Sequence, residues 1–466
     1  MSKEKKTNSN NNASFKANPV KNLSDSKGAR WSALFIVAFT MMAAYYVNDV
    51  MAPLKSMLEE QLHWTSGEFG FFTGAYSFLN VFLLMLIWGG LILDKFGIRF
   101  TGILSTVLMV AGTATEYIAI TQYTNSSEVI MGYKLDVFMA SAGYSVFGVG
   151  AEVAGITVTK IIAKWFQGKE MALAMGVQVA LARIGSQAAY AVAIPVAKAW
   201  NLDTPLFIGA IVLVGGLIAF LAFSFMDRKL DKQIKTSNIT SDEDKFSFKD
   251  VAAVVKNPGF WLIALLCVLF YSCVFPFQKF ATELMVTKYS VDEDLAGTFA
   301  GLPALGALFL TPLFGGMIDK KGKAASIMML GAAMLIGVHF VYSLPFIHSP
   351  FIAIGLMIIL GIAFSLVPSA MWPSVAKIFP VKQLGTAYAL IFFIQNIGLW
   401  GIPALIGLVL EKYCIVGTEG GKNLYDYTLP MIIFTGIACL SLLVAFLLKA
   451  ADKKYGYKLE EANIKN

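Results

Sequence analysis

Charged residues are scarce in this chain, and so are the residues from which enzymes usually build active sites. Asp, Glu, Lys and Arg make up 14% of the 466 residues, whereas a soluble chain carries about a quarter. The three histidines stand far apart, and no Ser/His/Asp or metal-ligand set can be assembled from them. The four cysteines have neither ligand spacing nor the pattern of a disulfide framework. We therefore expect no enzyme, no metal and no cofactor.

Two further sequence signals are missing. There is no phosphate-binding G-x-x-x-x-G-K-[ST] loop, which argues against transport driven by ATP. The first 29 residues are rich in Lys, Asn and Ser, and they contain no apolar core followed by a small-residue cleavage site. We interpret them as a solvated, disordered tail and not as a signal peptide.

Long hydrophobic runs dominate the rest of the sequence. Hydrophobic residues make up 57% of the chain and recur in stretches of about 20 residues, the length that crosses the hydrocarbon core of a bilayer. This pattern predicts an all-α polytopic membrane protein with twelve transmembrane helices. The expected spans lie near 31–53, 67–93, 100–122, 137–162, 170–197, 205–227, 259–280, 296–318, 325–345, 350–376, 384–410 and 428–449.

The basic residues indicate how the chain is oriented. An even number of spans puts both termini on one side, and most of the 37 lysines and arginines fall in the tails and loops of that side. Such loops stay cytoplasmic, so we expect cytoplasmic termini in a bacterial inner membrane or a lysosome-like membrane. The basic residues flank spans and form no single patch, so the net charge of +7 predicts contact with the bilayer and no nucleic-acid partner.

The longest loop is charged and divides the chain into two halves of six spans each, expected to work as a monomer. Its last part, FSFKDVAAVVKNP, is expected to form a short amphipathic helix on the membrane surface. The expected parts are a tail (1–29), an N-terminal bundle (30–227), a cytoplasmic linker (228–258), a C-terminal bundle (259–450) and a second cytoplasmic tail (451–466).

One loop motif occurs at the same place in each half. GLILDKFG follows the second expected span and GGMIDKKG the eighth, and both fit G-x-x-x-D-K-x-G. Gly97 and Gly322 suit the positive-φ positions of short connections, while Asp94 and Asp319 are placed to cap a neighbouring helix. One copy alone would be an ordinary turn, but two copies in register indicate a duplication.

The whole membrane region resembles the major facilitator superfamily. The family's G-x-L-a-D-R-x-G-R-R loop lies between the second and third helices, where this chain has GLILDKFGIR, with Ile98 replacing the first of the two closing basic residues. The resemblance implies two six-helix bundles that rock around a central cavity, with the substrate bound near the membrane midplane. The loop residues that we assign to gating are Gly90, Asp94, Lys95, Gly97, Arg99, Asp319, Lys320 and Gly322.

Two opposite charges stand inside apolar runs of the first half. Glu152 lies in SVFGVGAEVAG and Arg183 in LARIGSQ, where a charge is costly unless it is paired or hydrated. Both stand almost the same number of residues from the turn near Gly168. At a rise of about 1.5 Å per residue, they therefore reach nearly equal depth on adjacent helices.

Two interpretations of this pair stay open from the residues alone. In the first, Glu152 and Arg183 form a structural salt bridge between their helices. In the second, they are separate poles of a cavity and hold the two ends of a zwitterion. The charged termini of an extended dipeptide lie roughly 6–7 Å apart, and the planar fork of Arg suits the carboxylate.

Longer stretches resemble one branch of the superfamily, the lysosomal dipeptide transporters. The similar segments include FGVGAE (147–152), WFQGKEMALAMGVQVALARIG (165–185) and MWPSVAKIFPVKQLGTAYALIFFIQNIGL (371–399). The resemblance implies that Glu152 receives the amino terminus of a peptide, that Arg183 receives its carboxylate, and that Trp372 shapes the pocket. It also implies tolerance of different side chains, and diffusion without ion coupling.

Four other residues complete the expected substrate site. Tyr45 and Asp49 share one helical face, and Asp49 is expected to gate, to bind an amino group or to cap an interface. Tyr271 and Asn396 are expected to supply polar contacts to the cavity or to bond across helices.

Structural roles are expected for three further titratable positions. Lys279 and Glu283 are one helical turn apart, which predicts a local ion pair at the membrane surface; the similar family has its lysine farther along, where this chain has Thr282. Glu116 is expected near the outer headgroups. His339 is expected to be a packing residue and not a proton relay.

The favoured function is a transporter of small peptides, chiefly dipeptides, that works by alternating access as a uniporter. The alternative is a proton-coupled symporter of organic anions or other small metabolites, with Arg183 for the anion and Glu152 for the proton. A non-transporting scaffold or receptor is the third possibility. The E-x-x-E-R motif of proton-coupled oligopeptide transporters is missing from the first helix, and no feature predicts an accessory subunit.

Overall fold

The computed structural model describes residues 22–124, 126–236, 248–419 and 422–464, and these are almost entirely helical. The strands of these ranges form two short antiparallel hairpins. The first pairs β1 (Val129–Ile130) with β2 (Tyr133–Lys134), and the second pairs β3 (Ile415–Glu419) with β4 (Lys422–Tyr425). The predicted all-α fold class is confirmed.

Long helices fill both halves of the chain. The first half contains α1 (Lys27–Val50), α3 (Ser66–Phe82), α4 (Met85–Gln122), α5 (Leu135–Trp165), α6 (Met171–Ala199) and α7 (Thr204–Thr236). The second half contains α9 (Pro258–Tyr289), α10 (Glu293–Ala300), α11 (Leu302–Lys321), α12 (Ala324–Ser343), α13 (Pro350–Ile378), α14 (Val381–Tyr413) and α15 (Thr428–Tyr455). Besides the 8-residue α10, three further helices are short: η1 (Leu23–Asp25), α2 (Lys55–Leu62) and α8 (Phe248–Lys256). α8 coincides with the expected amphipathic helix.

The second and third expected spans meet inside α4. Gly97 has φ 78° and ψ 173°, outside the helical region, and glycine adopts such a backbone without the steric penalty of a side chain. The chain reverses direction here, as the loop motif predicts. The second span is interrupted once more at Leu83 and Leu84, which separate α3 from α4.

Eleven helices of the described ranges are long and apolar enough to cross a membrane. The difference from the twelve expected spans has two causes: α3 has only 17 residues, and α4 contains two passes of the chain. Large apolar side chains such as Phe309 and Phe225 remain 68% and 67% exposed, as lipid-facing residues do. The chain is an integral, multi-pass membrane protein.

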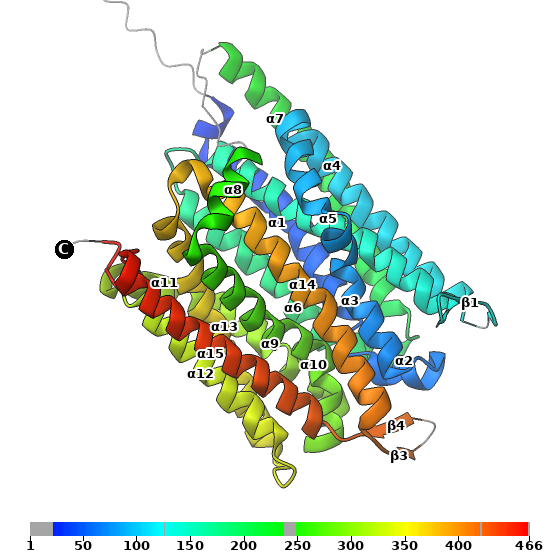
Figure 1. Ribbon diagram of the computed structural model, residues 1–466. Coiled ribbons are helices and arrows are strands. Elements are labelled where there is room, and N and C mark those ends of the chain that lie inside the picture. Colours follow the sequence, from blue (N-terminus) through cyan, green and yellow to red (C-terminus); the bar gives the residue numbers. More distant parts are fainter. Residues whose placement is uncertain (1–21, 125, 237–247, 420–421, 465–466) are drawn as a thin grey trace, which may run out of the picture.

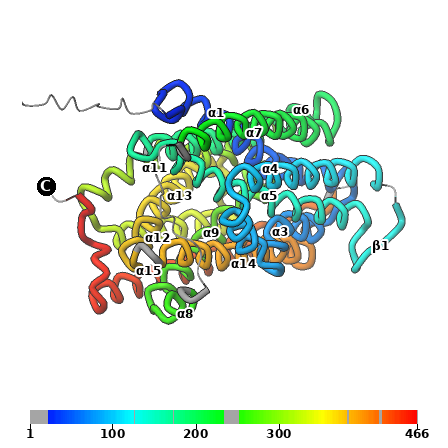
Figure 2. Tube along the Cα trace, turned by 90° about the horizontal axis from the view of Figure 1, so that it is seen from above, coloured from blue at the N-terminus to red at the C-terminus, as the bar shows by residue number. Residues whose placement is uncertain are grey.

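The helices run side by side between two ends of the molecule (Figure 1). The hairpin end consists of the connecting residues 51–65, 123–124, 126–134, 200–203, 290–292, 344–349, 414–419 and 422–427. The termini end consists of residues 22–27 and the segments 90–99, 166–170, 321–324, 379–380 and 456–464. Figure 2 shows the two halves next to each other, with α3, α4 and α5 on one side and α11, α12 and α15 on the other.

α3 and α14 form a close and extensive contact between the halves. A Cβ atom added at Gly70 would lie 2.5 Å from the carbonyl oxygen of Pro403, and one added at Gly74 would lie 2.5 Å from that of Trp400. Small residues allow such close approach between membrane helices. On the other side of the molecule, α6 of the first half packs against α10 and α11 of the second.

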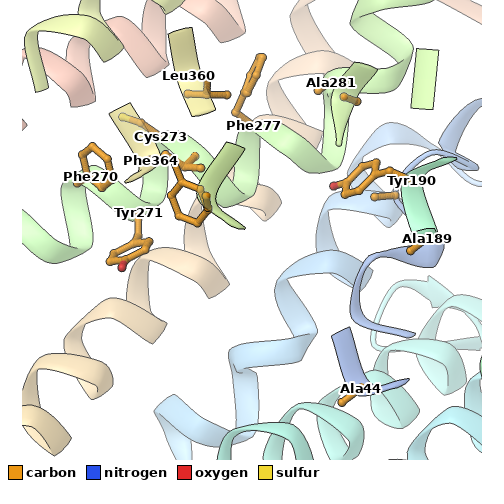
Figure 3. Close-up of a cluster of buried hydrophobic side chains, with 14 of the residues drawn as sticks. Ala44, Ala189, Tyr190, Phe270, Tyr271, Cys273, Phe277, Ala281, Leu360 and Phe364 are labelled. Carbon is orange, nitrogen blue, oxygen red and sulfur yellow. The ribbon is translucent and has the colours of Figure 1, made fainter. Parts of the chain in front are cut away.

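A continuous apolar core connects the two halves. Figure 3 shows part of it, with Phe270, Phe277 and Phe364 in the second half and Tyr190 of α6 in the first. Tyr190 also carries a polar contact across the halves, because its Oη donates a hydrogen bond to the backbone oxygen of Gln278 at 3.2 Å.

Candidate functional site

Glu152 on α5 and Arg183 on α6 are both half buried, and they do not pair with each other. Neither side chain lies within 4.0 Å of an opposite charge of the described ranges. Glu152 Oε1 instead accepts a hydrogen bond from Tyr76 Oη of α3 at 3.1 Å. Of the two interpretations left open above, the direct salt bridge is therefore absent from this structure.

The Arg183 guanidinium lies over two aromatic rings. Its Cζ atom is 5.7 Å from the ring centre of Tyr45 on α1 and 4.8 Å from that of Phe364 on α13. Its five N–H donors have no hydrogen-bond acceptor among the residues that the structure describes. Arg183 thus has aromatic neighbours from both halves of the chain but no anionic partner.

The position of α1 explains why the two charges stay apart. α1 packs along α6 and also touches α5, whereas α5 and α6 touch each other at few places. Tyr45 on α1 lies beside Arg183, with its ring centre 5.7 Å from the guanidinium Cζ atom. Residue counting predicts a similar depth for the two charges, but it does not predict a helix between them.

The second half brings a cluster of aromatic side chains to this region, which we call the aromatic wall. Trp372 Nε1 donates a hydrogen bond to Tyr271 Oη at 3.2 Å, and Tyr388 Oη donates one to the backbone oxygen of Trp372 at 3.1 Å. The Trp372 ring stacks on Phe392 with 4.7 Å between ring centres. The wall consists of Tyr271, Phe275, Phe364, Trp372, Tyr388 and Phe392.

Asn396 and Asp49 do not contact Glu152 or Arg183, which we call the central charges. Asn396 is 1% exposed, and its Nδ2 donates to the backbone oxygen of Phe392 in its own helix. Asp49 Oδ1 pairs with Lys279 Nζ of the opposite half at 2.9 Å. The predicted local pair of Lys279 with Glu283 is therefore wrong, because Lys279 reaches across to α1.

Glu283 belongs to a buried network at the hairpin end, which we call the outer network. Its Oε2 lies 2.6 Å from Lys55 Nζ and accepts a short hydrogen bond from Tyr427 Oη. Lys55 Nζ is also 3.6 Å from Glu59, whose Oε1 accepts from Tyr425 Oη at 2.8 Å. Sequence reasoning missed this network, because 228 positions separate Lys55 from Glu283 and hydrophobic periodicity reports only local neighbours.

Two further titratable groups are buried and form no ion pair with the charges just described. Glu116 is 0% exposed, and neither of its carboxylate oxygens has a hydrogen-bond partner in the described ranges. It is thus enclosed between helices, and its expected depth near the outer headgroups stays a prediction. The ring Nε2 of His339 lies 3.0 Å from the backbone oxygen of Cys273, and the ring stacks on Phe434. His339 is the packing residue that we expected.

A comparison with protein families identifies the family of this chain. The family model of the Major Facilitator Superfamily matches residues 34–403, most of the chain. The chain belongs to this superfamily. It is therefore a membrane transporter and not an enzyme, and the resemblance of its loop motifs is confirmed at the level of the family.

Curated relatives of this transporter extend over nearly the whole chain. The lysosomal dipeptide transporter MFSD1 of Mus musculus is 28% identical over 447 residues, which cover 92% of this chain and 88% of that protein. The Homo sapiens protein of the same name is 27% identical with the same coverage. The inner membrane transport protein YdiN of Escherichia coli is 26% identical over 212 residues, 44% of this chain and 47% of that protein.

Solved structures show the same fold at lower identity. A bacterial homologue of the human lysosomal transporter Spinster, in an inward-facing and unoccupied conformation, has a TM-score of 0.70 and 14% identity, with 92% of this chain and 98% of that chain covered. The nucleoside transporter NupG has a TM-score of 0.67 and 14% identity, with coverage of 91% and 99%.

The first copy of the superfamily's loop motif lies at the termini end, where its charges pair within the first half. Asp94 pairs with Lys160 of α5 at 3.1 Å, and Arg99 pairs with Asp231 of α7 at 2.9 Å. These residues line a surface pocket of about 270 Å³. Lys95 is exposed and lies near the Phe96 ring.

The second copy is held by the C-terminal segment of the chain. Asp319 Oδ1 accepts a hydrogen bond from Asn463 Nδ2 at 2.7 Å, and Lys320 is exposed. Gly322 has the expected positive φ, 70°. The prediction that both aspartates cap helices is wrong: their carboxylates bind Lys160 and Asn463 instead.

Proposed function

We propose that this transporter moves small peptides, chiefly dipeptides, by alternating access as a uniporter, and that Arg183 and Glu152 hold the two peptide ends. The observation that carries the proposal is the half-buried Arg183 guanidinium, which has no anionic partner in the described ranges. A cation inside a membrane protein is costly unless it is paired or hydrated. An anion supplied by the substrate fits this place, and Arg can bind a carboxylate with two parallel hydrogen bonds.

Glu152 supplies the opposite pole for the peptide amino group. One of its oxygens accepts from Tyr76, and the other has no hydrogen-bond partner among the described residues. Because more than 4.0 Å separates the charged atoms of Glu152 and Arg183, a zwitterion can bridge them without first breaking a salt bridge. An extended dipeptide, with ends roughly 6–7 Å apart, suits such a gap.

The aromatic residues of the site carry no formal charge. Tyr45 lies next to Arg183, and Trp372 and Tyr271 belong to the aromatic wall of the opposite half. A wall without formal charge accepts side chains of several kinds, which agrees with recognition through the peptide ends. The similarity to lysosomal dipeptide transporters over 92% of the chain gives independent support.

Alternating access requires a gate at each end of the molecule, and we assign these gates to other residues of the chain. Among the described residues, the hydrogen bonds and ion pairs that join the halves lie toward the hairpin end, including Asp49–Lys279 and Gln187 Nε2 to the backbone oxygen of Thr298. We propose that these contacts gate the hairpin end and that the two loop motifs gate the termini end. We place the termini in the cytoplasm, because basic residues concentrate in the loops of that side.

Ligand-induced thermal stabilisation of the purified protein tests the proposal. We expect Ala-Ala to raise the melting temperature, and N-acetylated Ala-Ala, Ala-Ala amide and free Ala to have little effect. Arg183→Gln and Glu152→Gln should each weaken dipeptide binding by about thirtyfold or more, since each leaves one charge of the bound peptide unpaired. Glu116→Gln is the matched control, because it alters a buried carboxyl outside the site. Equal responses to Ala-Ala and its blocked forms would refute recognition of the termini.

Symport of an organic anion with protons is the second candidate, and the free Arg183 guanidinium is the observation that favours it. Uptake into liposomes separates the two functions. A uniporter takes up dipeptide to equilibrium without a pH gradient and does not concentrate it when a gradient is applied. Concentration of succinate or another dicarboxylate under an inward proton gradient, with no response to dipeptides, would establish the alternative.

A further inference from the structure

Phe364 stands at the contact between the aromatic wall and the central charges. Arg183 belongs to α6 of the first half and Phe364 to α13 of the second, and the guanidinium lies 4.8 Å from the centre of the ring. Tyr45 provides the second ring, at 5.7 Å, from α1. Although both central charges come from the first half, one neighbour of Arg183 comes from the second.

The Phe364 ring is held firmly by its own half. It is 2% exposed and packs edge-on against Phe275 at 5.3 Å and Tyr271 at 6.3 Å between ring centres. Tyr271 stacks on Phe275 and accepts the hydrogen bond of Trp372. Figure 3 shows Phe364 next to Tyr271 in this packed region. The ring is thus a fixed support for the guanidinium.

An aromatic support has a particular consequence for an arginine. A ring face attracts the cation through its quadrupole but does not use up N–H donors as a carboxylate would, so the donor fork stays available for a ligand. The ring also limits the positions that the long side chain can take. A ligand that binds an oriented side chain loses less entropy in ordering it.

We propose that Phe364 is a positioning residue, which orients Arg183 for the carboxylate of the substrate. The proposal rests on the proposed function and deepens it, because residues of both halves would then form the carboxylate subsite. Phe364 touches Arg183 and acts through it. Its removal should therefore weaken only the binding of ligands that carry a free carboxylate.

The experiment compares Phe364→Leu and Phe364→Met with Phe364→Trp and with Phe434→Leu. Phe434 is a fully buried aromatic of α15 that packs on His339, so its substitution controls for loss of core packing. Isothermal titration of the purified full-length variants would measure the dissociation constants of Ala-Ala and Ala-Ala amide. Phe364→Met introduces a flexible, unbranched apolar side chain that fills irregular gaps, so it gives a second measurement where the Leu variant does not fold.

We expect Phe364→Leu and Phe364→Met to weaken Ala-Ala binding by about threefold to thirtyfold, the range of a cation–π contact, and to leave the weak amide binding unchanged. Phe364→Trp keeps an aromatic ring and should bind Ala-Ala as tightly as the wild type does. Phe434→Leu should also leave Ala-Ala binding unchanged. Unchanged Ala-Ala binding in Phe364→Met, or an equal loss in Phe434→Leu, would overturn the proposal while the proposed function stands. A wild-type protein that binds acid and amide equally would overturn both.

Discussion

At the hairpin end some ion pairs are buried and join the two halves, as Lys55–Glu283 does, whereas the ion pairs that the structure describes at the termini end stay within one half. The side chains of Lys55 and Glu283 are 2% and 4% exposed. Those of Arg99 and Asp231 are 34% and 31% exposed, and both belong to the first half. The same residue types therefore join the halves at one end and stiffen a single half at the other.

The difference in burial translates into a difference in free energy. An exposed ion pair stabilises a protein by about 0–1 kcal/mol, but removing one partner of a buried pair costs about 3–5 kcal/mol, because the other charge is left unpaired. Contacts of the second kind join the halves at the hairpin end. In the alternating access that we propose the halves separate there, so the outer network opens as a unit.

Lys55→Met is expected to lower the stability of the protein more than the other substitutions in this comparison of the two ends. The substitution leaves Glu59 and Glu283 buried at 6% and 5% exposure without their cation. We expect a loss of about 3–5 kcal/mol from the state with a closed hairpin end, seen as a large drop in the melting temperature of the purified protein. Lys95→Met at the termini end is the matched control, since Lys95 is exposed. Similar melting temperatures for the two variants would remove the distinction between the ends.

The fold was largely predictable from the sequence, for a physical reason. A membrane-spanning segment needs an apolar run of fixed length, and this signal is local in the chain, so the spans around α5 and α13 appear in the sequence directly. The turn at Gly97 was predictable from its motif, because glycine is favoured at positive φ. The break at Leu83 and Leu84 was not, since neither residue type signals a helix end.

The candidate site was predictable only in part. Charges inside apolar runs are rare enough to single out Glu152 and Arg183 individually. Their separation depends on how α1 packs against α5 and α6, and packing between spans leaves no periodic trace in the sequence. The partner of Lys279 was mispredicted for the same reason: the nearest acid in sequence was Glu283, but the nearest in space is Asp49.

Gly70→Ala tests the backbone part of the hairpin-end contact and is expected to have an intermediate effect. The new methyl group would lie 2.5 Å from the carbonyl oxygen of Pro403, so α3 and α14 must move apart, at a cost of about 1–3 kcal/mol. Gly90→Ala is the control, because no atom lies within 4 Å of its added Cβ. We expect a lower melting temperature for Gly70→Ala than for Gly90→Ala. The opposite order would show that α3 and α14 do not form a tight joint.

Arg30→Gln is expected to have the smallest effect, because it removes an ion pair of the termini end. Arg30 Nη2 lies 2.9 Å from both carboxylate oxygens of Glu170, and this hydrogen bonding holds the pKa of Glu170 below its ordinary value. A lowered pKa in the folded state stabilises the protein above the unfolded pKa, and this contribution disappears as the pH falls through the folded pKa. Wild type should therefore melt slightly above Arg30→Gln at neutral pH, and the gap should close toward acid pH. A gap as large as that of Lys55→Met, or one that widens in acid, would show that this pair, in which the Glu170 side chain is 38% exposed, behaves like the buried network at the hairpin end.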